Sequence, residues 1–163
     1  MKSSSLFISL AFFIISACSN NYKDTVDVDW HILMKETLVG QYGGDDNQLF
    51  LFISDNMCSE CIIQEYLNIN KCGMSINIIG YFNYKRNFVS SVNKTFIDKS
   101  IFIDRFKFEK KCIPNEFPIQ PVYFIYDKKK MNMYEIFYPQ PCNKESTYLY
   151  FEKIKRIINN SNS

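Results

Sequence analysis

The chain has 163 residues, of which 47% are hydrophobic and 17% aromatic, and its formal net charge is +2. This length and apolar content suit one globular domain with a substantial core. The near-neutral charge argues against nucleic acid as a partner, because such binding needs a strongly basic surface; the one tight basic run, at residues 128–130, is typical of a solvated turn.

The first 18 residues have the order of an export signal. Lys2 gives a short basic head, residues 6–15 form an apolar run too short to span a bilayer comfortably, and two small residues precede Cys18. This order resembles the signal of bacterial lipoproteins, in which cleavage precedes a cysteine that becomes acylated. The resemblance implies that residues 1–17 are removed and that Cys18 carries the lipid anchor. The alternative is an ordinary secretory signal followed by an unrelated cysteine.

If Cys18 is acylated, the protein belongs to the cell envelope, on the periplasmic or cell-surface side of a bacterial membrane. Residues 18–29 are polar and poor in core-forming side chains, which indicates a tether. The folded domain is expected over residues 30–163. Apolar positions between residues 28 and 41 predict a short amphipathic helix near its start.

The most informative stretch is an apolar run followed by two cysteines. Residues 49–53 predict a buried strand, and a polar turn separates it from Cys58 and Cys61. A helical pattern begins at Cys58 and is expected to end near residue 70, with Gly73 as a left-handed cap. The free N–H groups and the dipole of a helix start stabilise a thiolate, so a cysteine placed there ionises and attacks disulfides more readily.

The rest of the chain alternates apolar runs with turn residues. Apolar residues at every second position indicate strands, and a spacing of three or four indicates helices. In chain order we expect a strand at 75–82, a helix at 87–97, a short strand or extended piece at 101–103, a loop with Cys112, Pro114 and Pro118, a strand at 122–126, a turn, a partner strand at 131–138, and a helix at 146–159 capped by Ser146.

Two features carry a resemblance to the thioredoxin fold. Cys58-Ser59-Glu60-Cys61 follows a strand, and Pro121 opens a later strand that continues into a hairpin and a last helix. The resemblance covers about residues 30–160 and implies an α/β domain with a central mixed sheet of about four strands flanked by helices. It also implies that Pro121 is cis and faces Cys58, and that the backbone of Gln120 docks an extended substrate segment. An ordinary trans proline at a strand start is the alternative.

The chain departs from cytoplasmic thioredoxin at three places. Met57 stands where that protein has tryptophan, Ser59 and Glu60 replace a Gly-Pro pair, and Phe52 occupies the position of a buried aspartate. These departures resemble the divergent, extracytoplasmic, lipid-anchored members of the thioredoxin-like family.

The activity that this resemblance implies is thiol–disulfide exchange with protein thiols and disulfides. Cys58 attacks a substrate disulfide, Cys61 resolves the mixed disulfide, and an unidentified electron donor restores the thiols. Near the pair in sequence, Asp55 and Glu60 are acidic, and no lysine or arginine occurs before Lys71. Negative charge destabilises a thiolate, so we expect reduction or isomerisation rather than strong oxidation.

Two other interpretations of the cysteine pair are open. A zinc site is disfavoured because no second such pair exists and His31 is the single histidine, so no metal or other cofactor is expected. A purely structural disulfide between Cys58 and Cys61 would instead make the protein a redox-silent thioredoxin-like lipoprotein that acts as a protein-binding module.

Three cysteines remain, and one of them must be unpaired within the chain. In a thioredoxin-like layout, Cys112 and Cys142 fall toward the active end and Cys72 falls away from it. This favours a Cys112–Cys142 disulfide with Cys72 as a buried free thiol, although three pairings are open.

Overall fold

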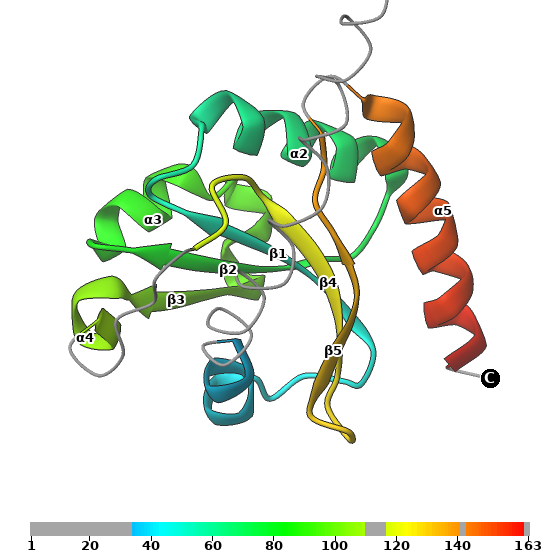
Figure 1. The fold of residues 1–163 in the computed structure, drawn as a ribbon, viewed down its shortest axis with the longest axis horizontal. Coiled ribbons are helices and arrows are strands. Elements are labelled where there is room, and N and C mark those ends of the chain that lie inside the picture. Colours follow the sequence, from blue (N-terminus) through cyan, green and yellow to red (C-terminus); the bar gives the residue numbers. More distant parts are fainter. Residues whose placement is uncertain (1–33, 110–116, 141–142, 162–163) are drawn as a thin grey trace, which may run out of the picture.

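The computed structural model describes residues 34–109, 117–140 and 143–161, which form a five-stranded mixed sheet flanked by helices (Figure 1). A helical segment at residues 34–41 precedes the sheet. The elements that follow are β1 (Gln48–Ser54), α2 (Ser59–Cys72), β2 (Asn77–Phe82), α3 (Lys85–Ser91), the 3-10 helix η1 (Lys94–Lys99), β3 (Ser100–Asp104), α4 (Arg105–Glu109), β4 (Val122–Asp127), β5 (Asn132–Phe137) and α5 (Lys144–Ser161).

The strand order is β3-β2-β1-β4-β5, so β1 is the central strand. It pairs in parallel with β2 and antiparallel with β4, and β3 continues the parallel half. The expected count of about four strands becomes five because residues 100–104, of which 101–103 were expected as a short strand or extended piece, all pair with residues of β2. The carboxyl ends of β1, β2 and β3 therefore meet at one edge of the sheet, on the left in Figure 1.

One face of the sheet is covered by α2, α3 and α5. The Tyr123 ring of β4 meets Phe151 of α5 with ring centroids 5.1 Å apart. Gly80 of β2 lies directly under the ring of Phe88 from α3, and a Cβ at this glycine would be 2.1 Å from that ring. The absence of a side chain at Gly80 is thus what lets α3 approach the sheet.

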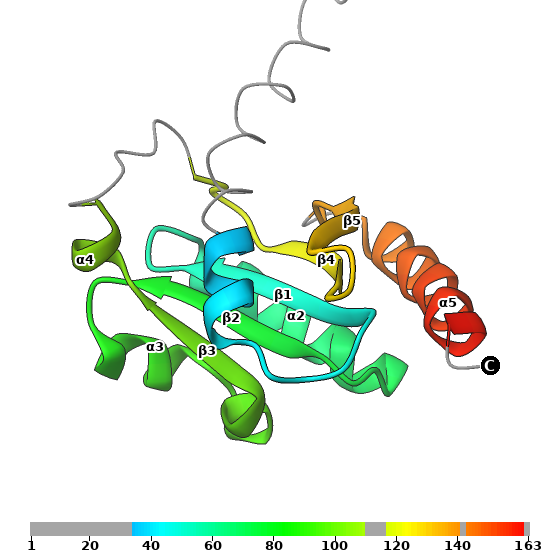
Figure 2. The same ribbon diagram turned by 90° about the horizontal axis from the view of Figure 1, so that it is seen from below.

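The opposite face carries the helical segment at residues 34–41 (Figure 2). Phe50 of β1 stacks on Phe124 of β4 at 5.4 Å between ring centroids, and Tyr42 contacts the edge of Phe50 at 5.0 Å. Met34 and Leu38 are fully buried. Because strand side chains alternate between faces, β1 is buried on both sides, which explains its continuous apolar sequence.

Three local features differ from expectation. The helix expected at 87–97 is interrupted, because Val92 is extended and Asn93 caps a separate 3-10 turn through its side chain. The helix α4 was not predicted. The last helix begins two residues earlier than expected, and Asn143, not Ser146, caps it by accepting the Ser146 N–H.

The expected signal sequence, Cys18, the tether, His31, Cys112 and Cys142 lie outside the described residues. In the described part of the chain, no helix is both long enough and apolar enough to cross a membrane.

Candidate functional site: a cysteine pair at the start of α2

The turn between β1 and α2 is anchored by Met57. Its side chain is 8% exposed, and its sulfur accepts a hydrogen bond from the Ser54 N–H at 3.3 Å. The Met57 N–H donates in turn to the Ser54 carbonyl at 3.2 Å. The buried side chain of Met57 therefore fixes the position at which α2 begins.

Cys58 is the N-cap of α2 and is exposed to solvent. Its backbone is extended, and its carbonyl accepts the first helical hydrogen bond from Ile62 at 3.2 Å. The backbone and thiol of Cys61 and the backbone of Glu60 lower the pKa of the Cys58 thiol, and they outweigh the opposing charge of Glu60. Unpaired N–H groups at a helix start thus stabilise the Cys58 thiolate.

Cys61 lies one helical turn further on and is half-buried. The pKa of its thiol is raised, first by its interaction with the Cys58 thiol, then by burial and by the negative charges of Cys58, Glu60 and Glu65. The two thiols thus differ in exposure and in the direction of their pKa shifts, and neither is in a disulfide.

A buried carboxylate lies about one helical turn after Cys61 on the same helix. Glu65 is 5% exposed, and the hydroxyl of Tyr123 donates to its Oε2 at 2.9 Å while Asn68 donates to both carboxylate oxygens at 3.3 and 3.4 Å. Burial raises the pKa of Glu65, although these hydrogen bonds oppose that shift. Residues four apart on a helix are neighbours, which places this carboxylate next to Cys61.

A second acid near the pair, Asp55, is bound by groups from the segments that follow β2 and β3. Arg105, the first residue of α4, donates to Asp55 Oδ1 at 2.9 Å, and the Asn83 N–H donates to Oδ2 at 3.0 Å. The guanidinium of Arg105 also lies over the ring of Tyr81 at 5.7 Å. These contacts join the segments that follow β1, β2 and β3.

Gln120 and Pro121 precede β4, and Phe52 of β1 pairs with Val122, so they lie at the same edge of the sheet as Cys58. Pro121 is buried and Gln120 is half-buried. The described residues contain no cis peptide bond, so the expectation of a cis Pro121 is wrong. Trans is the lower-energy isomer of an X–Pro bond, and nothing in the residues beside Pro121 itself selects cis.

Cys72, at the carboxyl end of α2, is free and half-buried, packed against the core. Burial raises the pKa of its thiol. Because α2 runs away from the carboxyl edge of the sheet, Cys72 is remote from the pair.

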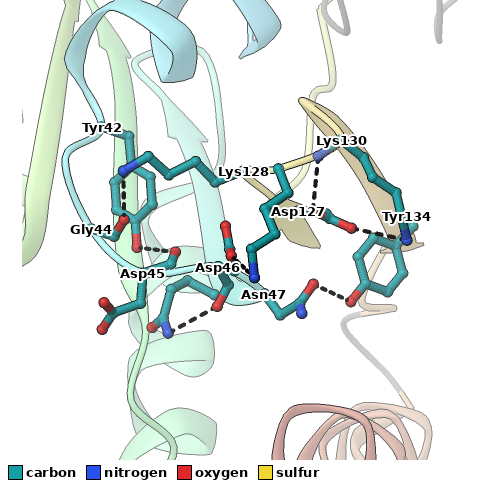
Figure 3. A network of polar contacts seen from close by, with 11 residues as sticks. Tyr42, Gly44, Asp45, Asp46, Asn47, Asp127, Lys128, Lys130 and Tyr134 are labelled. Carbon is teal, nitrogen blue, oxygen red and sulfur yellow. Dashed lines mark hydrogen bonds and ion pairs between the residues drawn. The ribbon is translucent and has the colours of Figure 1, made fainter. Parts of the chain in front are cut away.

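A second polar cluster lies at the opposite end of the sheet (Figure 3). Asn47 accepts a hydrogen bond from the Tyr134 hydroxyl at 2.9 Å, and Lys130 pairs with Asp127 at 3.2 Å. With Asn132, these residues line a hollow of about 390 Å³. Their polar groups are largely engaged with one another, and they tie the β4–β5 hairpin to the start of β1.

Sequence reasoning missed two residues of the site. Glu65 could have been found as a charged side chain between Ile62 and Tyr66 on the apolar face of α2. Arg105 gave a weaker signal, since it is recognisable only once β3 is known to end beside β2.

No family model matches this chain, and no curated protein matches it either. Among the described residues, no three His, Cys, Asp or Glu side chains form a group that could hold a metal ion. What the site offers chemically is an exposed thiol that ionises readily, a half-buried thiol that does not, and a buried carboxylate.

Proposed function

We propose that this protein is a thioredoxin-like thiol–disulfide oxidoreductase, anchored through Cys18 in a bacterial cell envelope. The observation that carries the proposal is the asymmetry of the cysteine pair. Cys58 is exposed with a lowered pKa, and Cys61 is half-buried with a raised pKa. Attack on a foreign disulfide needs the first kind of thiol, and resolution needs a second thiol within reach of it.

The exchange proceeds in two displacements. The Cys58 thiolate attacks one sulfur of a substrate disulfide, which forms a mixed disulfide and releases the other substrate sulfur as a thiolate. The thiolate of Cys61 then attacks the Cys58 sulfur and releases the second substrate thiolate. The substrate disulfide gains two electrons, the protein pair becomes a disulfide, and an unidentified donor must reduce it again.

The coupling between the two thiols orders these displacements. The negative charge of the Cys58 thiolate is one cause of the raised pKa of Cys61. When Cys58 enters a mixed disulfide that charge disappears, so the pKa of Cys61 falls and its thiolate forms when it is needed. In the proposal, the resolving thiol stays protonated until there is a bond for it to attack.

The acids near the pair oppose the Cys58 thiolate less than their positions in the sequence suggest. Asp55 is engaged by Arg105 at 2.9 Å, and the unfavourable charge of Glu60 is outweighed at Cys58 by the backbone and thiol of Cys61 and the backbone of Glu60. A stabilised thiolate shifts the pair toward its reduced form. The sequence predicts either reduction or isomerisation, and a pair that stays reduced favours isomerisation. An isomerase needs a reduced, ionised Cys58 to attack incorrect disulfides.

One observation favours the second candidate, a redox-silent protein-binding module. The trans peptide before Pro121 departs from the family's active-site geometry, in which the proline is cis. In such a module the pair would serve only to fix the start of α2.

Trapping separates the two candidates. The Cys61→Ser variant should accumulate mixed disulfides through Cys58, visible on non-reducing gels and lost on reduction, because the resolving thiol is gone. A Cys58→Ser variant and a Cys72→Ser variant are the controls: the first should trap nothing, and the second should behave as the wild type. If Cys61→Ser gives no adduct even with a small disulfide in excess, the oxidoreductase proposal fails.

A further inference from the structure

An exposed aromatic pair lies at the carboxyl edge of the sheet, on the segments that follow β2 and β3. Tyr84, the N-cap of α3, is 53% exposed and Phe106 of α4 is 51% exposed. Their rings touch edge to face with centroids 5.8 Å apart. Two large rings that pack on each other while half their surface faces water are typical of a contact site.

Cations border this aromatic pair. The guanidinium of Arg86 lies over the Tyr84 ring at 5.6 Å, and Lys85 is the neighbouring exposed residue. The ion pairs of the described residues include neither Lys85 nor Arg86, whereas the acids nearby, Asp55 and Asp104, are engaged by other cations. The surface formed by Tyr84, Lys85, Arg86 and Phe106 therefore carries positive charge beside apolar area.

This surface is connected to the cysteine pair. Asp55, three residues before Cys58, binds the Asn83 N–H, which immediately precedes Tyr84, and binds Arg105, which immediately precedes Phe106. Adjacent strands are about 4.8 Å apart, so segments leaving β2 and β3 lie roughly 5–10 Å along the edge from the segment leaving β1. A polypeptide whose disulfide meets Cys58 can lie across both rings.

We propose that Tyr84, Lys85, Arg86 and Phe106 form a docking surface for the chain that flanks the substrate disulfide, and that this chain is acidic with an apolar residue among its carboxylates. The inference rests on the proposed function and adds a substrate class to it. Carboxylates would face Lys85 and Arg86, and the apolar residue would cover the exposed rings. Such charge complementarity acts mainly on the rate of encounter.

The test uses peptides whose single cysteine forms a mixed disulfide with thionitrobenzoate, so that attack by reduced protein releases a coloured thiolate. Three peptides differ only in the flanking residues, which are glutamate, glutamine or lysine, each with one phenylalanine. At low salt the acidic peptide should react roughly fivefold faster than the basic one. The difference should vanish at 1 M salt, where the Debye length is about 3 Å.

Two charge-matched variants locate the effect. Lys85→Gln combined with Arg86→Gln should remove most of the preference for the acidic peptide. The control combines Lys71→Gln with Lys94→Gln and removes the same amount of positive charge. These two exposed lysines lie on α2 and η1, which lead the chain to the amino ends of β2 and β3. The control should leave the preference for the acidic peptide intact. Phe106→Ser should slow the peptides with phenylalanine about threefold relative to alanine versions.

The mixed disulfide of thionitrobenzoate with mercaptoethanol separates the two levels of the proposal. It has no flanking chain, so all variants should release thionitrobenzoate from it at the same rate. One outcome is that the protein releases thionitrobenzoate from this small disulfide but reacts at equal rates with the acidic and the basic peptide. This outcome refutes the docking surface and leaves the proposed function standing. If no thionitrobenzoate is released, the proposed function is refuted. The docking surface is then tested separately by the binding of fluorescein-labelled peptides in which serine replaces the cysteine, measured by fluorescence anisotropy. Tighter binding of the acidic peptide supports the surface, and equal binding of the acidic and basic peptides refutes it.

Discussion

Arg105 Nη1 lies 2.9 Å from Asp55 Oδ1, and this contact joins two residues that are fifty positions apart in the chain. Both side chains are partly buried, with 30% of Arg105 and 16% of Asp55 exposed. The pair holds the segment that precedes Cys58 against the segment that follows β3.

Arg105→Gln should therefore weaken the fold and raise the pKa of Cys58. A partly exposed ion pair contributes about 1 kcal/mol, which corresponds to a fall in melting temperature of roughly 2–4 °C for a protein of this size. The released Asp55 carboxylate would add negative charge near Cys58 and oppose its ionisation. Thermal unfolding and the pH dependence of alkylation measure the two effects. In a double-mutant cycle with Asp55→Asn, additive losses would show that the pair has no coupling energy.

The pH dependence of alkylation should show that Cys58 ionises below the ordinary cysteine pKa of about 8.5. Iodoacetamide reacts with the thiolate only, so the midpoint of the rate profile of the reduced protein reports this pKa. Glu60→Gln should lower the midpoint further, because the charge of Glu60 raises the pKa of Cys58. Cys58→Ser should abolish the fast phase. A midpoint at or above the ordinary value would contradict the stabilisation of the Cys58 thiolate at the helix start.

Glu65 should make the protein less stable as pH rises. Burial raises its pKa in the folded state, so the folded protein holds this proton more tightly than the unfolded chain does. Its contribution to stability is therefore complete below the unfolded glutamate pKa of about 4.3 and is lost as pH rises through the higher folded value. Glu65→Gln should flatten this part of the profile, measured by urea unfolding between pH 4 and pH 8.

The same Glu65→Gln variant has a second readout. Because the Glu65 charge contributes to the raised pKa of Cys61, removing it should lower the pKa of Cys61. Alkylation of Cys61 in a Cys58→Ser background gives that value. An unchanged Cys61 midpoint would mean that the carboxylate is too far from the thiol to act on it.

Gly80→Ala should destabilise the protein by about 1–3 kcal/mol, as overpacking does in a filled core. The new Cβ would lie 2.1 Å from the Phe88 ring, which is itself wedged near Phe82 and Phe102. Phe88→Leu in the same chain should recover part of the loss, because the smaller side chain makes room. Gly43→Ala, where nothing lies within 4 Å of the new atom, is the matched control. Equal effects of the two glycine substitutions in urea unfolding would refute the packing argument.

The local parts of this structure were predictable from sequence, and the long-range parts were not. The buried strand β1, the helix that starts at the cysteine pair and the left-handed Gly73 follow from apolar spacing and cap chemistry. The edge position of β3, the pairing of Asp55 with Arg105 and the contact of Glu65 with Tyr123 join residues far apart in sequence. A single sequence contains no signal for such pairings until the sheet order is known.

For Pro121, the sequence predicts the position of the residue but not the isomer of its peptide bond. Its place at the start of β4 follows from the apolar run after it, and the structure places β4 there. Its isomer does not follow from those residues, because cis and trans X–Pro bonds differ by only about 0.5–1 kcal/mol.

The central place of β1 has a consequence during synthesis. Gln48 pairs with Tyr126, so one side of this strand stays without its partner until the β4–β5 hairpin has left the ribosome. Until then, seven residues that carry six buried side chains present an unpaired strand edge, the kind of surface that seeds aggregation. A nascent chain of this protein should therefore depend on holding chaperones until β4 docks, and fragments that end before residue 122 should be insoluble.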